Sequence, residues 1–385
     1  MPEPDYDIVI AGAGPVGSAL ALMLARYALA PERIALVGAS FGHREALPES
    51  APDPRSIAVN HGSIELLRKL QAWPPQYRPI ETVHVSQQGR LGRTLIQHAD
   101  LDVPELGGVV SYSDLLACLH SALETTGVTC IEGKRAGLQM NALPEVRTQA
   151  HRIQAYVGVQ SDGARPKGLE KHYDQCAILT VVKAGEPRAG WAFERFTQQG
   201  PLALLPHPSG PDHYGVVWCC RPDTAAQLRD TPETEFNQHL QNLFGHRLGS
   251  LSVLGERTVY PLSLHAGPTR IGQRGVAIGN AAQTLHPVAG QGLNLGLRDA
   301  AQLAQTLRFW LTQPHGSPEP ALDHYTRLRK PDRWLTTAVT DFLPRIFSTR
   351  QPVVEHAAGL ALFGMDLSLG LRMPLAHHLL QGLRR

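Results

Sequence analysis

The chain has 385 residues, of which 43% are hydrophobic and 18% charged, and its formal net charge is +2. These values describe an ordinary globular protein of two or three domains, and the scattered Lys and Arg residues predict no nucleic-acid partner. The cysteines are odd in number and have no metal-ligand spacing, which predicts a reduced, cytosolic protein with no metal site. No signal peptide and no apolar run of the roughly 18 residues needed to span a bilayer are expected.

The N-terminal segment has the pattern of a dinucleotide-binding unit. A buried strand is predicted over 6–11 and a helix over 18–26, with the sequence Gly12-Ala13-Gly14-Pro15-Val16-Gly17 between them. This G-x-G-x-x-G follows a strand and opens a helix, which is the setting that a pyrophosphate site requires. A second strand is predicted over 34–37. The acid that should follow it to hold a ribose hydroxyl is absent, because Gly38-Ala39-Ser40 stands there. Either ribose recognition comes from another segment, or the affinity for an adenine dinucleotide is weakened.

The middle of the chain alternates between helical and extended patterns. Arg55, in the segment before a helix predicted over 62–70, is placed to hold a phosphate or a flavin edge, although a solvated loop residue fits equally well. Strands over 82–86 and 93–97 predict a hairpin, and a helix is expected over 113–123. A further strand over 155–159 leads to Asp162-Gly163. From Cys176 to about Leu254 the pattern becomes one of strands, which predicts a smaller domain with an antiparallel sheet; these strands are expected over 177–182, 191–196, 202–205 and 214–219.

The segment from Gly279 to Ala300 organises the rest of the chain. It follows a short buried strand predicted from Gly275 to Ile278 and ends in a helical pattern that begins near Leu293. The loop between them contains several glycines, which leave backbone N–H groups uncovered at the positive end of the helix. That arrangement suits a phosphate or a developing negative charge, whereas a plain strand–turn–helix connection would need a single glycine. Helices are expected to about Phe347, followed by an amphipathic helical tail from Val353.

With these residues in place, the chain resembles the flavin-dependent aromatic hydroxylases of the para-hydroxybenzoate hydroxylase fold. Among them it is most similar to the 2-polyprenyl-6-methoxyphenol hydroxylases of ubiquinone biosynthesis. The resemblance rests on the glycines of 12–17 and on the segments 53–56, 192–197, 200–206 and 279–300. The last segment is the most specific, because it has Asn280 where most flavin hydroxylases have Asp.

The resemblance implies an α/β (α+β) fold with two domains and a tail. A Rossmann-like FAD-binding domain would comprise residues 1–75, 105–165 and 258–345. An inserted antiparallel-sheet substrate domain would comprise 76–104 and 166–257, and 346–385 would form a C-terminal helical tail.

The resemblance also implies roles for individual residues. His286 and Pro287 would line the pocket where substrate meets flavin, and they are the catalytic candidates, although a structural His at a Pro turn explains His286 at least as well. Asn280 would reach the ribityl or pyrophosphate part of FAD, and Arg55 would lie beside the flavin. The remaining residues expected to bind the cofactor are Gly12, Gly14, Pro15, Val16, Gly17, Asp162, Gly163, Gly290, Gln291, Gly292, Leu293 and Asn294.

The implied reaction is the hydroxylation of a polyprenylated phenol. NAD(P)H would bind transiently and reduce FAD, and O2 would add to form a flavin C4a-hydroperoxide that the phenol ring attacks. Other ubiquinone-biosynthesis proteins are candidate partners. The tail either packs on the protein's own core or makes a peripheral contact with the inner membrane.

Three departures from the family pattern leave two other hypotheses open. The acid after the second strand is absent, Pro166 follows the Asp-Gly pair where a Ser is usual, and the next segment is short. The chain is therefore either an active hydroxylase or a catalytically weak or inactive homologue that scaffolds a ubiquinone-biosynthesis assembly. A flavin or nicotinamide oxidoreductase of another kind is the third hypothesis.

Overall fold

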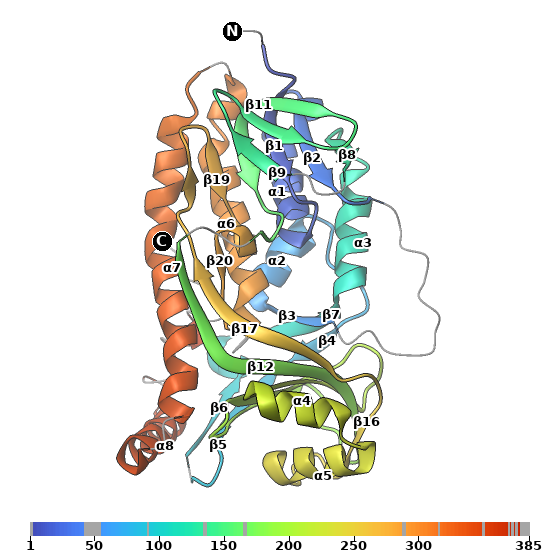
Figure 1. Cartoon of the computed structure of the whole chain (residues 1–385), viewed down its shortest axis with the longest axis vertical. Helices are drawn as coiled ribbons and strands as arrows, with labels where there is room; N and C mark the ends of the chain where they lie inside the picture. Colours follow the sequence, from blue (N-terminus) through green and yellow to red (C-terminus); the bar gives the residue numbers. More distant parts are fainter. Residues whose placement is uncertain are drawn as a thin grey trace.

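The computed structural model describes residues 3–41, 55–90, 92–133, 137–164, 168–286, 290–314, 316–348, 351–368, 370, 373 and 376–377. Two large sheets dominate the fold, one toward the top and one toward the bottom of Figure 1. The long helix α7 (Glu319–Ser348) runs beside both of them and contacts strands of each.

The first sheet is largely parallel. In spatial order its strands are β18 (Arg270–Ile271), β19 (Gly275–Ala277), β11 (Arg152–Gln160), β1 (Tyr6–Ala11), β2 (Ile34–Gly38) and β8 (Thr129–Glu132). The hairpin β9 (Gly137–Met140) and β10 (Pro144–Arg147) extends it beside β11. Alternate residues of β1 face opposite sides: Ile8 and Ile10 pack on helices, and Val9 packs toward β10. The sheet is therefore buried on both faces, as parallel sheets usually are.

Three helices cover the inner face of this sheet: α1 (Pro15–Ala25), α3 (Tyr112–Leu123) and α6 (Gln291–Leu307). Helix α1 contacts both α3 and α6, and α6 packs in turn against α7. The predicted helix over 18–26 thus begins earlier, at Pro15, because a proline with a fixed φ suits the first position of a helix. In the part of the chain that the structure describes, the short helices are η1 (Pro31–Arg33), η2 (His98–Leu101), η3 (Gly279–Ala281) and η5 (Trp310–Thr312).

Among the described residues, the second sheet has nine strands. In spatial order they are β20 (Gln283–Thr284), β17 (Thr258–Ala266), β12 (Leu169–Ala184), β15 (His213–Cys220), β14 (Pro201–Pro206), β13 (Trp191–Phe196), β5 (Thr82–Gln87) and β6 (Arg93–Gln97), with β16 (Leu251–Val253) beside β12. The predicted hairpin of β5 and β6 is confirmed. The strands predicted between 177 and 219 pair antiparallel with one another, as expected, and β13 pairs in addition with β5 in parallel.

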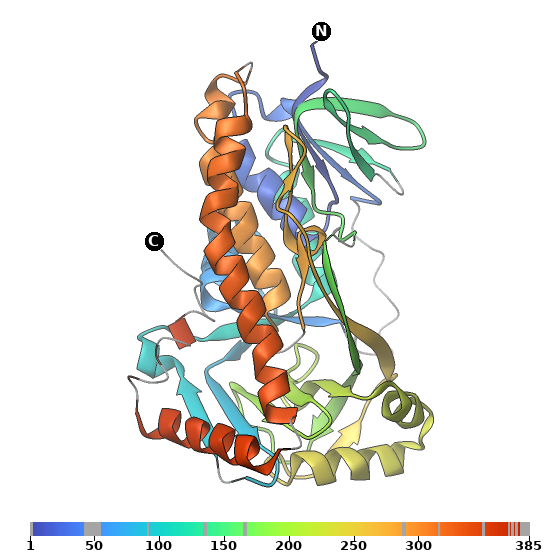
Figure 2. The same ribbon diagram turned by 60° about the vertical axis from the view of Figure 1, so that its left-hand side comes forward.

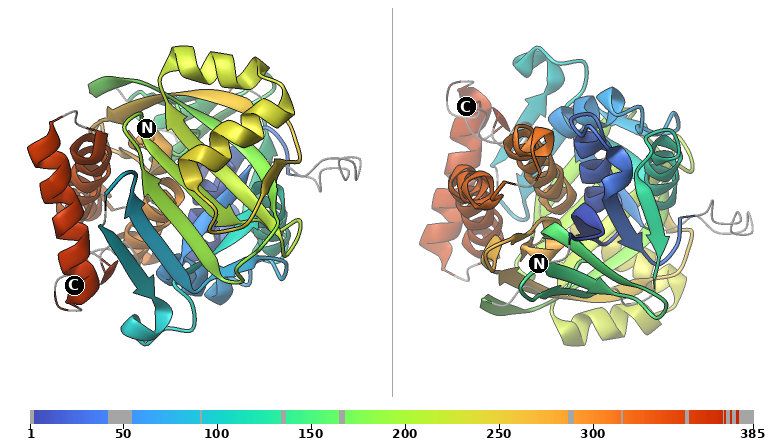
Figure 3. Two further views of the ribbon diagram at one scale, coloured as in Figure 1. Left: turned by 90° about the horizontal axis from the view of Figure 1, so that it is seen from below. Right: turned by 90° about the horizontal axis from the view of Figure 1, so that it is seen from above.

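Two helices that the sequence pattern did not predict cover the outer face of this sheet. They are α4 (Pro222–Asp230) and α5 (Glu233–Phe244), seen across the strands from below in Figure 3. Phe236, Leu240 and Phe244 of α5 join a buried cluster with Phe193 and Trp218 of the sheet. Because side chains alternate along a strand, the opposite face of the same sheet is left to border the interior of the molecule.

A small third sheet joins the two large ones. It consists of β3 (Ser56–Asn60), β7 (Gly107–Ser111) and β4 (Arg78–Ile80), and α2 (His61–Lys69) follows β3. Residues 56–60 were expected only to precede a helix, yet they form a strand that pairs with distant residues. After α7 the chain turns into α8 (Pro352–Leu367), which lies across the lower end of α7 and contacts β5 and β6 (Figure 2).

Candidate functional site

A large cavity connects the two halves of the molecule. Its volume is about 1210 Å³, and residues of both large sheets line it. At one end it meets the Gly12–Val16 loop and the end of β2. Further along it meets the loop before α6, and at the other end it is bordered by α7 and α8.

Each glycine of the first loop has a separate structural reason. Gly12 has a φ of +116°, and a Cβ there would come within 2.5 Å of the Asp162 backbone nitrogen. A Cβ on Gly17 would lie 2.0 Å from the Gly12 carbonyl oxygen, so only glycine lets α1 pack this closely on β1. A Cβ on Gly14 would meet nothing nearer than the Tyr112 hydroxyl at 3.8 Å. Gly14 therefore faces open space in the cavity.

Helix α1 presents uncovered N–H groups to that space. Its N-cap is Gly14, no side chain caps it, and its first turn has no acidic residue. The first N–H groups of a helix have no partner within the helix, and the helix dipole adds a partial positive charge. This end of the cavity is consequently suited to a phosphate group.

The end of β2 explains why the expected acid is missing. A Cβ on Gly38 would lie only 2.3 Å from the Cβ of Ala13, so a larger residue at this position would collide with the glycine loop. Ser40 follows two residues later, and it lines the cavity. Its hydroxyl is the polar side chain that this segment offers to a ribose. On the neighbouring loop, Asp162 accepts a hydrogen bond from the Ala164 N–H at 3.0 Å, and Gly163 has a φ of +72°.

A second helix N-terminus opens into the same cavity. Helix α6 begins after Gly290, which has a φ of +57° and provides no side-chain cap. A Cβ on Gly292 would meet only the Asn280 side-chain oxygen, at 4.0 Å. Asn294 holds this turn from below: its amide donates to the Gly290 carbonyl at 2.8 Å and its oxygen accepts from the Asn60 N–H at 2.9 Å.

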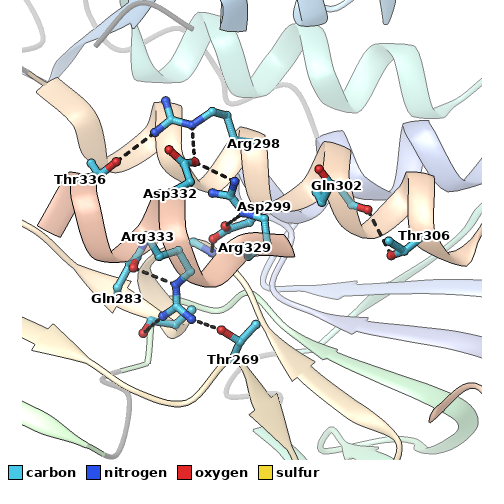
Figure 4. A network of polar contacts seen from close by, with 12 residues as sticks. Thr269, Gln283, Arg298, Asp299, Gln302, Thr306, Arg329, Asp332, Arg333 and Thr336 are labelled. Carbon is cyan, nitrogen blue, oxygen red and sulfur yellow. Dashed lines mark hydrogen bonds and ion pairs between the residues drawn. The ribbon is translucent and has the colours of Figure 1, made fainter. Parts of the chain in front are cut away.

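The turn that carries Asn280 is fixed by a buried ionic network between α6 and α7 (Figure 4). Asp299 accepts a hydrogen bond from the Gly279 N–H at 3.1 Å and pairs with Arg329 at 2.7 Å. Arg329 also pairs with Asp332 at 2.7 Å. These charges are buried, and each is compensated by a partner of opposite sign, as burial requires. The Asn280 side chain itself remains exposed to the cavity.

His286 lies at the junction between this segment and the second sheet. Its Nε2 is 3.4 Å from the Gln175 side-chain oxygen, and its ring meets that of Tyr173 edge-on with 5.2 Å between centroids. Burial lowers the pKa of His286 to about 4, so the imidazole is neutral at pH 7. It is therefore a hydrogen-bonding group of the cavity wall rather than a cation.

Comparison with known proteins identifies the family. The model of a family described as FAD binding domain matches residues 5–340. The chain belongs to this FAD binding domain family. It is 30% identical to the ubiquinone hydroxylase UbiL of Rhodospirillum rubrum, over 94% of this chain and 86% of that one. It is 28% identical to the 3-demethoxyubiquinol 3-hydroxylase of Escherichia coli, over 95% of this chain and 96% of that one.

The fold is also shared with the solved structure of a monooxygenase. The p-nitrophenol 4-monooxygenase PnpA of Pseudomonas putida superposes with a TM-score of 0.73 at 16% identity, over the whole of both chains. The predicted fold class, the resemblance to the flavin-dependent hydroxylases and the identification as an FAD-dependent enzyme are thus confirmed. The roles of single residues and the domain boundaries stay predictions. Strands β17 and β20, within the segment assigned to FAD binding, pair in the second sheet.

The structure gathers most of the predicted site residues around this one cavity. Gly17 lies beneath the loop, outside the lining, and Arg55 places its guanidinium 5.8 Å from the ring centre of Tyr112 rather than in the cavity wall. Pro287 lies outside the described residues. The predicted residues that line the cavity are Gly12, Gly14, Pro15, Val16, Asp162, Gly163, Asn280, His286, Gly290, Gln291, Gly292, Leu293 and Asn294.

The sequence analysis did not single out Glu194 as a site residue. Glu194 lies on β13 and lines the cavity, and burial raises its pKa to about 7. The signal was present in the sequence, since an acid stands at the centre of a strand between Ala192 and Phe196. Because side chains alternate along a strand, Ala192, Glu194 and Phe196 lie on the same face of β13. The Glu194 carboxyl therefore faces the same space as these two apolar side chains.

Proposed function

We propose that this flavoprotein hydroxylates the aromatic ring of a polyprenylated phenol in ubiquinone biosynthesis, using FAD, O2 and NAD(P)H. One observation carries the proposal: a single cavity joins the N-termini of α1 and α6 to a long apolar compartment. At about 1210 Å³ it exceeds the roughly 300–1,000 Å³ of an ordinary ligand pocket. It has room for a dinucleotide and for a second molecule beside it.

The residues present at the first end fit FAD. The open space above Gly14 and the uncapped start of α1 suit the pyrophosphate, and a methyl group on Gly14 would occupy that space. The second terminus, at Gly290–Leu293, offers N–H groups to a carbonyl-bearing ring such as the flavin pyrimidine. The Asn280 amide could form a hydrogen bond with either the pyrophosphate or the ribityl chain of FAD. When bound, FAD supplies the activation of O2; the protein orients the substrate and excludes water.

The other end of the cavity fits an isoprenoid chain. The walls there are apolar side chains of the sheet, of α7 and of α8, and they offer few polar groups to water. Such a lining binds a hydrocarbon tail by burial, at about 25 cal/mol per Å² of apolar surface. The residues of α7 and α8 at this end are Leu343, Phe347, Leu362 and Met365.

Helix α8 also supports a peripheral membrane contact. Leu362 and Met365 face inward, whereas Val353, Leu360, Phe363 and Leu367 are between 46% and 80% exposed. Their spacing of seven, three and four residues places these four on one stripe of the helix. Within the described chain, no helix is both long and apolar enough to cross a bilayer. One side of α8 is exposed and apolar, and its other side lines the compartment that we assign to the isoprenoid chain. A bilayer is the partner that fits this arrangement, because it would cover the apolar side and hold the substrate.

Turnover with a defined substrate series tests the proposal. The purified holoenzyme is supplied with NADPH, 18O2 and 2-prenylphenols bearing one, two or three isoprene units, and products are analysed by mass spectrometry. We expect one 18O atom in the ring product and a KM that falls with each added isoprene unit. A protein that takes up no FAD, or a KM indifferent to the tail, would contradict the proposal; the former result favours the scaffold hypothesis.

A further inference from the structure

Glu194 occupies an unusual place on the floor of the cavity. The pairing register of the second sheet sets six residues side by side in one transverse row. In spatial order these are Thr94, Val85, Glu194, Ala203, Val217 and Leu179. All six line the cavity. Glu194 is the one ionisable residue of the row, and it stands near its middle, with Thr94 at the end that meets α8.

The surroundings of Glu194 leave its carboxyl accessible from the cavity. Ala203 lies directly opposite on β14 and Ala192 precedes it on the same face, so small side chains flank the carboxyl. Arg195 points to the other face, where it donates to the Leu243 carbonyl at 2.7 Å. Among the described residues, no hydrogen bond or ion pair is found for the Glu194 carboxyl.

An unpaired carboxyl in an apolar wall has no structural benefit. Burying a charge without a partner is unfavourable by several kcal/mol, and the group responds by keeping its proton. Glu145 shows the structural alternative in the same chain. It is fully buried, but Arg147 and Arg152 both pair with it, the latter at 2.7 Å. An acid that stabilises this fold is thus paired, whereas Glu194 is not.

We propose that Glu194 is a catalytic residue that accepts a hydrogen bond from the phenolic hydroxyl of the substrate and takes its proton during hydroxylation. This inference rests on the proposed function. As a ring carbon forms a C–O bond with the electrophilic oxygen that O2 and reduced FAD would supply, the O–O bond of that oxygen donor breaks, and its electron pair leaves with the other oxygen, which ends as water. The phenolic O–H bond breaks in the same step: its electron pair forms a C=O bond to the ring, and its proton passes to the Glu194 carboxylate. The ring becomes aromatic again when the hydroxylated carbon loses its proton and the carbonyl oxygen takes up the proton held by Glu194.

The titration of the surrounding groups agrees with this role. Burial raises the pKa of Glu194 to about 7, so both of its protonation states are accessible near neutral pH. The Cys219 thiol faces the same part of the cavity from β15, and burial together with Glu194 raises its pKa well above the ordinary value. His286 is neutral there, because burial lowers its pKa to about 4. The lining residues of α7 and α8 that border this region are apolar, and Val85 and Ala203 flank Glu194 on the neighbouring strands.

Ligand binding to the oxidised holoenzyme tests the inference without turnover. A 2-geranyl-6-methoxyphenol and its O-methyl ether are titrated at pH 6 and pH 8, with the flavin absorption spectrum as the signal. At pH 8 we expect the phenol to bind at least tenfold more tightly than the ether, and the preference to shrink at pH 6. Equal affinities of the wild-type protein for phenol and ether at both pH values would overturn the proposal.

Two variants separate catalysis from structure. Glu194→Gln should shrink the preference for the phenol and make it independent of pH, lower kcat at least tenfold and remove the ionisation near pH 7 from the rate profile. Because it removes an unpaired acid, it should also melt at or above the wild-type temperature at pH 8. Glu145→Gln is the matched control, which should lower the melting temperature and keep the preference. An unchanged rate and pH profile in Glu194→Gln would overturn the inference. Phenol selectivity without any hydroxylated product would instead contradict the proposed function alone.

Discussion

Replacing Gly14 and Gly17 by alanine separates cofactor binding from packing. At Gly14 the added methyl group meets only the Tyr112 hydroxyl, 3.8 Å away, and the φ of −72° is allowed for alanine. Alanine has fewer backbone conformations than glycine in the unfolded chain, which stabilises such a variant by about 0.4–1 kcal/mol. Alanine is also a poorer N-cap residue than glycine, which offsets part of this gain. The apoprotein should therefore keep its stability within about 1 kcal/mol of the wild type.

FAD binding should respond in the opposite way. The methyl group would occupy the space above the loop where we place the pyrophosphate, so we expect the Kd for FAD to rise at least about tenfold, or about 1.4 kcal/mol. In Gly17→Ala the new Cβ would lie 2.0 Å from the Gly12 carbonyl oxygen, a backbone atom that cannot turn away. Helix α1 must then shift from β1, which should destabilise the apoprotein by about 1–3 kcal/mol.

Two measurements on the apoproteins decide between these outcomes. Urea unfolding gives the stability of each variant, and quenching of flavin fluorescence gives the Kd for FAD. The reasoning about the pyrophosphate is refuted if Gly14→Ala binds FAD with the wild-type Kd. The packing argument is refuted if Gly17→Ala unfolds at the wild-type urea concentration.

Four further predictions concern other parts of the site. Asn280→Asp should retain FAD, whereas Asn280→Leu should lose about 1–3 kcal/mol of FAD binding free energy, measured by the same quenching assay. Asn294→Leu leaves the Asn60 N–H without its acceptor, so thermal unfolding should show a loss of about 1–3 kcal/mol. Because the pKa of His286 is lowered in the folded protein, protonation favours the unfolded chain, and the free energy of unfolding should fall as the pH drops from about 6.5 toward 4. In His286→Gln this fall should be smaller by up to about 3 kcal/mol, as measured by urea unfolding at each pH. A Leu360→Ser/Phe363→Ser variant should float less with anionic liposomes than the wild type, whereas Phe309→Ser, an exposed residue elsewhere, should float equally.

Local patterns predicted the dinucleotide half of the fold well. The strand Tyr6–Ala11 was predicted with its observed bounds, because a short apolar run before glycines is a strong local signal. The glycine spacing likewise identified the loop, and the open space at Gly14 agrees with the role expected of the second glycine.

Features that depend on distant partners were missed. The strand β3 exists because it pairs with residues 107–111, and no pattern within 56–60 reveals that partner. The parallel pairing of β13 with β5 joins segments about a hundred residues apart. Helix α5 was missed for a different reason: Phe236, Leu240 and Phe244 recur at helical spacing, but the strands on both sides dominated the interpretation.

The same reasoning applies to the site. Glycines and motifs could be located from sequence because each imposes a local backbone demand. Glu194 required the knowledge that its strand has one face on a cavity, and this follows only from how two sheets pack together. The support of Asn280 by Asp299 and Arg329 also needs α7 to return beside α6, which the sequence of either helix does not show.

The order of strands in the first sheet has a consequence for synthesis on the ribosome. Strand β1 lies between β2 and β11, and β19 completes the row only when residue 277 has been made. The nine-stranded sheet is largely inserted between β11 and β19, and α6 and α7 follow later still. A nascent chain therefore leaves one edge of its nucleotide-binding sheet unpaired until residue 277 has been made, and leaves the face that α6 covers exposed until residue 307 has been made. FAD cannot stabilise the complete site during that interval, because the helix terminus at the start of α6 has not yet been made.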